Sequence, residues 1–139
     1  KSALKWILGN TNYSNKDIIL YGESLGTAVA VELGVHNIYK SIILEAPFTS
    51  ILEIAKKKYP IYPVKLLVLD QFDSYSKIHN IKSPLMIISG KKDEIVPHSH
   101  STKLFIKANK PKKSLFIDEA MHNNLYDFKI DKEVIKFNS

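Results

Sequence analysis

A serine between two glycines is the residue of this sequence whose setting points most directly to chemistry. Residues 22–26 read Gly-Glu-Ser-Leu-Gly, a G-x-S-x-G pattern centred on Ser24. A short apolar run precedes the pattern, and small and aliphatic residues with a helical pattern follow it. A serine on a sharp strand-to-helix turn presents its hydroxyl above a sheet, and the N–H of Leu25 at the helix start favours a developing oxyanion. We expect Gly22 and Gly26 to keep this crowded turn free of Cβ atoms.

A serine hydroxyl needs a general base, and the base needs an acid to orient it. Asp93 follows the apolar run Leu85–Ser89, and His122 follows the run Ser114–Ile117. Because the carboxyl ends of parallel strands lie at one edge of a sheet, we expect Ser24, Asp93 and His122 to converge there. The alternative interpretation of Ser24 is a helix N-cap flanked by glycines.

Two other acidic residues lie close to the ends of the later strands. Glu94 is the neighbour of Asp93 in the sequence and could serve as the acid. We favour Asp93, because Gly90 and a tight turn place it nearer the end of the strand. Asp118 closes a strand, and we expect it to be structural.

The remaining histidines lack comparable settings. His36 follows the end of a helical pattern, and His79 lies in a polar loop. His98 and His100 form a His-x-His pair, but no carboxylate or cysteine completes it at a metal-ligand spacing. We therefore expect His98 and His100 to be surface residues, and the sequence predicts no metal or cofactor.

Short apolar runs alternate with helical patterns along the chain, which is typical of βα units and a mostly parallel sheet. A helix is expected before the first strand. The expected strands are Asp17–Tyr21 (buried on both faces), Ser41–Ala46, Leu85–Ser89 and Ser114–Ile117. The expected later helices are Leu25–Leu33 (ended by Gly34), Ser50–Lys58 (capped by Ser50), Ser99–Ala108 and Asn124–Phe137. The fold class is therefore α/β, with about four strands flanked by helices.

Composition excludes several classes of function. The chain has no cysteine, which excludes thiolate catalysis, disulfides and cysteine-ligated zinc. All 20 basic residues are lysines, and a protein without arginine lacks the forked donor that usually reads guanine and phosphate. We therefore expect no nucleic-acid partner. No apolar run approaches the roughly 20 residues of a membrane-spanning helix, and a cytoplasmic location is the default expectation.

Taken together, these motifs resemble the α/β-hydrolase superfamily over nearly the whole chain. The segments that carry the resemblance are Gly22–Gly26, Gly90–Pro97 and Met121–Leu125. More narrowly, four segments are similar to the Bem46-like branch: Leu44–Ser50, Tyr59–Pro63, Phe72–Ser74 and Gly90–Pro97. The resemblance implies that Ser24 is the nucleophile, Asp93 the acid and His122 the base.

The resemblance also implies that residues 1–139 form the C-terminal half of a larger fold. Early strands and an H-G-rich loop, which donates the second oxyanion N–H, have no counterpart here. We expect one partial domain with a short lid-like segment near residues 59–75. There Tyr62, Val64, Leu66 and Leu67 could line an acyl pocket or simply pack in the core. The open edge of the first strand is expected to pair with the missing N-terminal half.

The preferred hypothesis is a serine hydrolase that cleaves an ester or related acyl bond through an acyl-enzyme. Its substrate would be a small molecule or an acyl group. A serine peptidase would use the same residues, so it stays an alternative. A non-catalytic remnant or interaction module with a partial hydrolase fold is the second alternative. Membrane association through an N-terminal segment outside residues 1–139 is left open.

Overall fold

Four parallel strands form one sheet with the order β1-β2-β3-β4 in the part of the chain that the structure describes. The computed structural model describes residues 2–58 and 72–139, with the side chains of residues 57 and 58 excepted. The strands are β1 (Ile19–Glu23), β2 (Ser41–Glu45), β3 (Leu85–Gly90) and β4 (Lys112–Ile117). The predicted α/β class and the four strands are confirmed. The lid-like segment near residues 59–75, with its pocket residues, lies largely outside the described residues.

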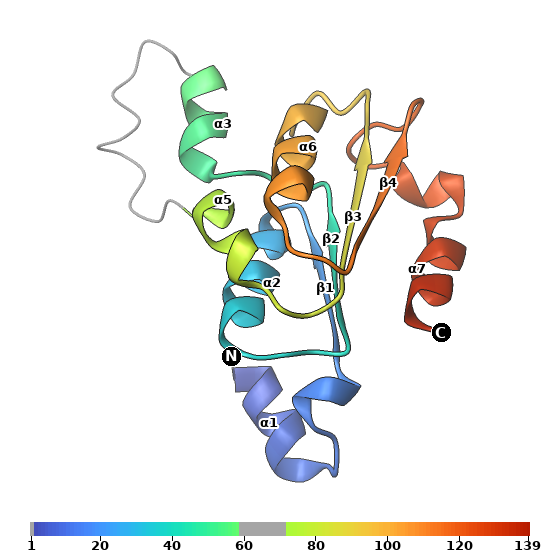
Figure 1. Cartoon of the computed structure of the whole chain (residues 1–139). Coiled ribbons are helices and arrows are strands. Elements are labelled where there is room, and N and C mark those ends of the chain that lie inside the picture. Colours follow the sequence, from blue (N-terminus) through green and yellow to red (C-terminus); the bar gives the residue numbers. More distant parts are fainter. Residues whose placement is uncertain (1, 59–71) are drawn as a thin grey trace.

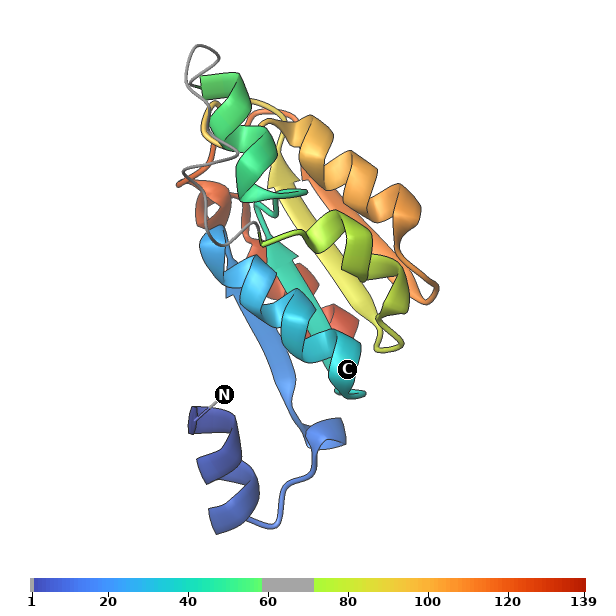
Figure 2. The same cartoon turned by 90° about the vertical axis from the view of Figure 1, so that its left-hand side faces the viewer.

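Helices lie on both faces of the sheet (Figures 1 and 2). The α-helices are α1 (Ser2–Asn10), α2 (Leu25–His36), α3 (Ile51–Lys58), α5 (Ser74–Lys77), α6 (His98–Lys107) and α7 (Ile130–Asn138). The 3-10 helices are η1 (Asn15–Asp17), η2 (Ile78–Asn80) and η3 (Leu125–Phe128). Helices α2, α5 and α6 cover one face, and η3 with α7 covers the other. Helix α3 stands beyond the carboxyl ends of the strands, and α1 lies near the opposite end.

The core consists of two layers because alternate strand residues point to opposite faces. Ile42, Leu44 and Ile87 pack with the α2 and α6 side chains. On the other face, Met86 and Ile88 pack against η3 and α7. Strands β2 and β3 are buried along their whole length, which explains why they read as continuous apolar runs.

Strand β1 differs from the prediction of burial on both faces. It pairs only with β2, and Ile19 and Tyr21 are 40% and 42% exposed. Apolar sequence alone does not distinguish an inner strand from an edge strand. In the described structure β1 is an edge strand, which agrees with the expectation that the first strand has an open edge.

One helix end and one whole helix differ from the sequence prediction. Helix α2 continues through Gly34 to His36, since Gly34 is buried against Ile42 and serves packing rather than termination. The helix expected over residues 124–137 is interrupted at Lys129, which has left-handed backbone angles (φ 58°, ψ 38°). The predicted N-cap at Ser50 is confirmed, because its Oγ accepts the N–H of Glu53 at 3.2 Å.

Candidate active site

Ser24 stands on a strained turn between β1 and α2. Its φ is 46° and its ψ is −113°, a region that L-residues rarely occupy and that costs about 1–3 kcal/mol. The Ser24 N–H donates to the carbonyl of Glu45 (2.9 Å), and the Ser24 carbonyl accepts the N–H of Thr27 (3.1 Å). Neighbouring backbone therefore holds the turn on both sides.

The two glycines of the pattern have different roles. A Cβ on Gly22 would lie 2.5 Å from the carbonyl oxygen of Gly26, so only glycine fits where the strand meets the helix. A Cβ on Gly26 would meet nothing within 4 Å. The expectation that Gly26 also relieves crowding is therefore wrong in the described structure, because the close approach involves its backbone rather than its α-hydrogens.

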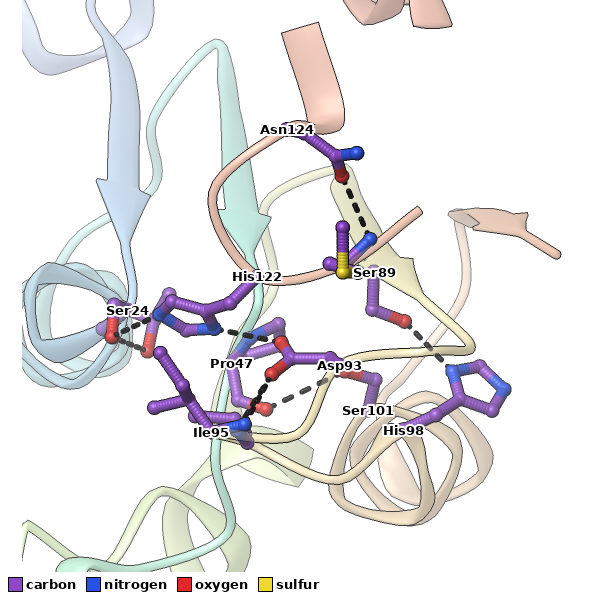
Figure 3. A network of polar contacts seen from close by, with 12 residues as sticks. Ser24, Pro47, Ser89, Asp93, Ile95, His98, Ser101, His122 and Asn124 are labelled. Atoms are coloured by element: carbon purple, nitrogen blue, oxygen red, sulfur yellow. Dashed lines mark hydrogen bonds and ion pairs between the residues drawn. The ribbon is translucent and has the colours of Figure 1, made fainter. Parts of the chain in front are cut away.

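Asp93 lies in the turn between β3 and α6, and backbone groups fix its carboxylate. Its Oδ1 accepts the N–H groups of Ile95 (2.9 Å) and Val96 (2.8 Å). The residue is only 6% exposed. These two bonds leave Oδ2 directed at His122, as Figure 3 shows.

The loop that carries His122 packs directly on the loop that carries Asp93. A Cβ on Gly90 would lie 2.1 Å from the carbonyl oxygen of Ala120, so this approach also requires glycine. The same carbonyl accepts the N–H of Lys92 at 3.0 Å. On the far side of the loop, Asn124 Oδ1 accepts the Met121 N–H at 2.7 Å.

A continuous path of hydrogen bonds joins the three predicted residues (Figure 3). His122 Nδ1 lies 2.7 Å from Asp93 Oδ2, and His122 Nε2 lies 3.1 Å from Ser24 Oγ. An ionised carboxylate only accepts hydrogen bonds, so Nδ1 carries the ring hydrogen and donates a hydrogen bond to Asp93 Oδ2. Nε2 is then the acceptor for the hydroxyl of Ser24. This arrangement can remove a proton from the serine.

Glu45 is a second buried carboxyl group near this path, and the sequence reasoning did not single it out. It ends β2, is 2% exposed, and accepts a hydrogen bond from the hydroxyl of Tyr21. Burial raises the pKa of Glu45, and nearby Glu23 acts in the same direction, whereas the Tyr21 hydroxyl and His122 lower it. Burial and the bond to Glu45 raise the pKa of the Tyr21 hydroxyl.

Two pockets flank the Ser24–His122 contact. An apolar pocket of about 300 Å³ is lined by Ser24, Leu25, Phe48, Ile51, Ile54, Ala55, Ile95 and Val96. A more polar pocket of about 260 Å³ is lined by Lys92, Glu94, Ile95, Met121, His122, Asn123 and Asn124. Ile95 lines both pockets. The site thus offers apolar space on one side of the serine and, near the histidine, a second space whose lining includes the polar side chains of Lys92 and Asn123.

Glu94 and Asp118 lie outside the path of hydrogen bonds. Glu94 is exposed, while Asp93 makes the bond to His122. Asp118 is exposed and pairs with Lys91 at 2.6 Å, and the bond from Lys91 lowers the pKa of Asp118. Asp118 therefore has a surface ion-pair role beside the end of β4 and takes no part in the path.

The other histidines divide into two groups. His36, at the end of α2, and His79, in η2, are exposed and lie outside the path. The prediction of a surface residue is wrong for His100, whereas His98 is partly exposed. His100 is 7% exposed and lies 2.7 Å from Thr49 Oγ1. The ring of His98 packs edge-on against Phe116, and burial lowers its pKa.

No group of three or more metal-ligating side chains lies together in residues 2–58 and 72–139. Over the same ranges, no helix combines the length and apolar character needed to cross a bilayer.

Comparisons with known proteins agree with this geometry. The family model of the prolyl oligopeptidase family matches residues 2–124. An uncharacterized protein of Mycobacterium tuberculosis is 35% identical over 124 residues, which cover 89% of this chain and 44% of that protein. The human alpha/beta hydrolase domain-containing protein 17B is 32% identical over 126 residues, which cover 86% of this chain and 41% of that protein. The chain thus spans less than half the length of these relatives.

A solved structure shows the same fold at lower identity. The acetyl xylan esterase from Paenibacillus sp. R4 superposes with a TM-score of 0.79 at 17% identity, covering 99% of this chain and 49% of that one. The parallel sheet, the strained turn at Ser24 and the family match agree with one another. The chain belongs to the prolyl oligopeptidase family of the α/β-hydrolase superfamily.

Proposed function

We propose that the chain carries the catalytic residues of a serine hydrolase that cleaves an ester or related acyl bond. The observation that carries this proposal is the path from Ser24 Oγ through His122 to Asp93, with contacts of 3.1 and 2.7 Å. A nucleophile, a base and an orienting acid at these separations constitute the arrangement that acyl transfer requires. An N-cap role alone does not account for it, since the Ser24 side chain makes no capping bond to α2.

The proposed reaction proceeds through an acyl-enzyme. His122 Nε2 takes the proton of Ser24, and Oγ forms a bond to the acyl carbon. The N–H of Leu25 stabilises the resulting oxyanion at the start of α2. Asp93 stabilises the imidazolium, which then gives its proton to the leaving group as the acyl bond breaks. Water, with His122 again as base, hydrolyses the ester of Ser24 and regenerates the free hydroxyl.

The pockets suggest how a substrate lies across the site. The pocket of about 300 Å³ beside Ser24 is lined mainly by apolar side chains and suits the acyl group. The pocket of about 260 Å³ contains Lys92 and Asn123 and suits a polar leaving group. The sequence analysis did not identify three residues of the apolar pocket, Phe48, Ile51 and Ile54. Apolar residues in a loop and a helix are equally typical of ordinary core packing.

A serine peptidase is the second candidate, and the match to the prolyl oligopeptidase family favours it. Within the superfamily we propose the Bem46-like branch, which the identity to domain-containing protein 17B supports. We further propose a cytoplasmic protein whose N-terminal half, outside residues 1–139, completes the fold beside β1. The non-catalytic alternative predicts that Ser24 has no effect on any activity.

The test is hydrolysis of p-nitrophenyl acetate, p-nitrophenyl butyrate and a peptide p-nitroanilide by the full-length gene product. For Ser24→Ala we expect a loss of at least about 10³-fold in kcat. Ser76→Ala is the matched control, because Ser76 is exposed on α5 and its hydroxyl bonds to the Asp73 carbonyl rather than to the residues of the path. Esters cleaved faster than the anilide would support the esterase, and the reverse would support the peptidase. Full activity in Ser24→Ala would overturn the proposal.

A further inference from the structure

His100 is a buried histidine that the proposed reaction does not use. It lies on α6 and is 7% exposed. A polar ring is costly to bury unless it is hydrogen-bonded. Its Nδ1 lies 2.7 Å from the hydroxyl oxygen of Thr49 and 3.3 Å from the Thr49 nitrogen. Nδ1 donates to the hydroxyl when it carries the ring hydrogen and accepts the N–H when it does not, so either tautomer ties Thr49 to α6.

The hydroxyl of Thr49 extends this contact to helix α3. Its Oγ1 donates to Oε2 of Glu53, in the first turn of α3, at 2.6 Å. The carbonyl of Thr49 accepts the N–H of Tyr75 on α5 at 3.0 Å. Thr49 therefore joins α3, α5 and α6 at one point.

Phe48, which precedes Thr49, is held from both sides. On its other side, the carbonyl of Pro47 accepts the hydroxyl of Ser101 at 3.4 Å (Figure 3). Pro47 and Thr49 are thus bonded to consecutive residues of α6, Ser101 and His100. Phe48 itself is 3% exposed. Because the backbone is anchored on both sides of it, the position of Phe48 follows that of α6.

The anchored segment forms one wall of the apolar pocket beside Ser24. That pocket has a volume of about 300 Å³, and this wall consists of Phe48 and of Ile51, Ile54 and Ala55 from α3. Neither Thr49 nor His100 is among the described residues that line the pocket. The two residues therefore act on the pocket through Phe48 and α3.

We propose that Thr49 and His100 are positioning residues of the acyl pocket: their contact fixes Phe48 and α3 against α6 and thereby sets the preference of the site among acyl chains. The inference rests on the proposed function, because that function places the acyl group in this pocket. Each methylene that the wall buries contributes about fourfold to kcat/KM. A wall released from α6 buries the chain less completely, and the loss is larger for a longer chain.

The experiment compares p-nitrophenyl hexanoate with p-nitrophenyl acetate as substrates of the full-length gene product. The readout is the ratio of their kcat/KM values, which a smaller fraction of folded enzyme does not change. In the wild type we expect the hexanoate to be preferred by at least about tenfold. For Thr49→Val, which removes the hydroxyl from a side chain of similar shape, we expect the ratio to fall by about 4–16-fold, the contribution of one to two methylenes. Thr49→Ser keeps the hydroxyl and should retain the ratio.

Thr102→Val is the matched control. It removes the hydroxyl from another threonine–histidine contact of α6, that of Thr102 Oγ1 with His98 Nε2 at 3.2 Å, and we expect no change in the ratio. A merely structural role for the Thr49–His100 contact would lower both kcat/KM values equally, and that result would overturn the inference. A wild type that does not prefer the longer ester overturns it as well, because the pocket then does not hold the chain.

If Thr49→Val does not fold, Glu53→Ala decides, since Glu53 is exposed and its loss removes the link from Thr49 to α3. We expect its ratio to fall by about 2–4-fold, and an unchanged ratio contradicts the inference. Absence of any Ser24-dependent hydrolysis in the wild type overturns the proposed function itself. Ser24-dependent hydrolysis with unchanged ratios in the variants overturns only the role of Thr49 and His100.

Discussion

Replacing Gly22 with alanine tests the turn that carries Ser24. The added Cβ would lie 2.5 Å from Gly26 O, 2.7 Å from Gly26 C and 2.8 Å from Thr27 Cα. All three are backbone atoms, so no side chain can rotate away. Ordinary contact begins near 3.4 Å, which means that the first turn of α2 must move away from β1 by about 3.4 − 2.5 = 0.9 Å.

Such overpacking costs about 2–3 kcal/mol. In a domain of this size that corresponds to a fall in Tm of about 6–12 °C. Thermal unfolding followed by circular dichroism measures it. The matched control is Gly26→Ala, four residues along, where the new Cβ meets nothing within 4 Å. Because alanine favours a helix by up to about 1 kcal/mol over glycine, its Tm should stay the same or rise by about 3 °C. Equal Tm values for the two variants would refute the packing argument at the turn.

Three further predictions address the acid, a helix junction and acid stability. Asp93→Asn should slow ester hydrolysis by about 10³–10⁴-fold, because the amide no longer stabilises the imidazolium or fixes its tautomer; a loss below about tenfold would exclude Asp93 as the acid. Lys129→Gly should raise Tm by about 3 °C by relieving left-handed strain, whereas Lys132→Gly within α7 should lower it by a similar amount. The pKa of Glu32 is held below its usual range, first by the bond from Lys77. Its stabilising contribution is therefore present above the unfolded pKa of about 4.3 and is lost as the pH falls. The wild-type Tm should fall between about pH 6 and about pH 3, and in Glu32→Gln this fall should be slightly smaller. The same thermal unfolding assay measures both, and a fall of equal size in the two proteins would contradict the prediction.

The placement of the candidate site could be predicted because it depends on local signals and one topological rule. Ser24 follows a strand and opens a helix, and its pattern of glycines marks a sharp turn. Asp93 and His122 each follow a later strand. Since parallel strands bring their carboxyl ends together, these separate turns meet at one edge of the sheet. No knowledge of side-chain packing was needed for that step.

Other features depend on packing that a single sequence does not encode locally. Gly34 looks like a helix stop, but Ile42 packs against it and the helix continues. His100 looks exposed next to polar residues, yet α6 turns it inward towards Thr49. Glu45 reads as the polar end of a strand, whereas it is buried and accepts the hydroxyl of Tyr21 from β1. In each case a tertiary neighbour decides the environment.

Mass spectrometry of the full-length gene product after reaction with a fluorophosphonate tests the central claim most directly. The proposed function predicts one adduct, on the peptide that contains Ser24. It also predicts that Ser24→Ala abolishes this adduct and that His122→Ala slows its formation by at least about 10²-fold. An adduct on another residue, or labelling that persists unchanged in Ser24→Ala, would contradict the claim that Ser24 is the nucleophile of this protein.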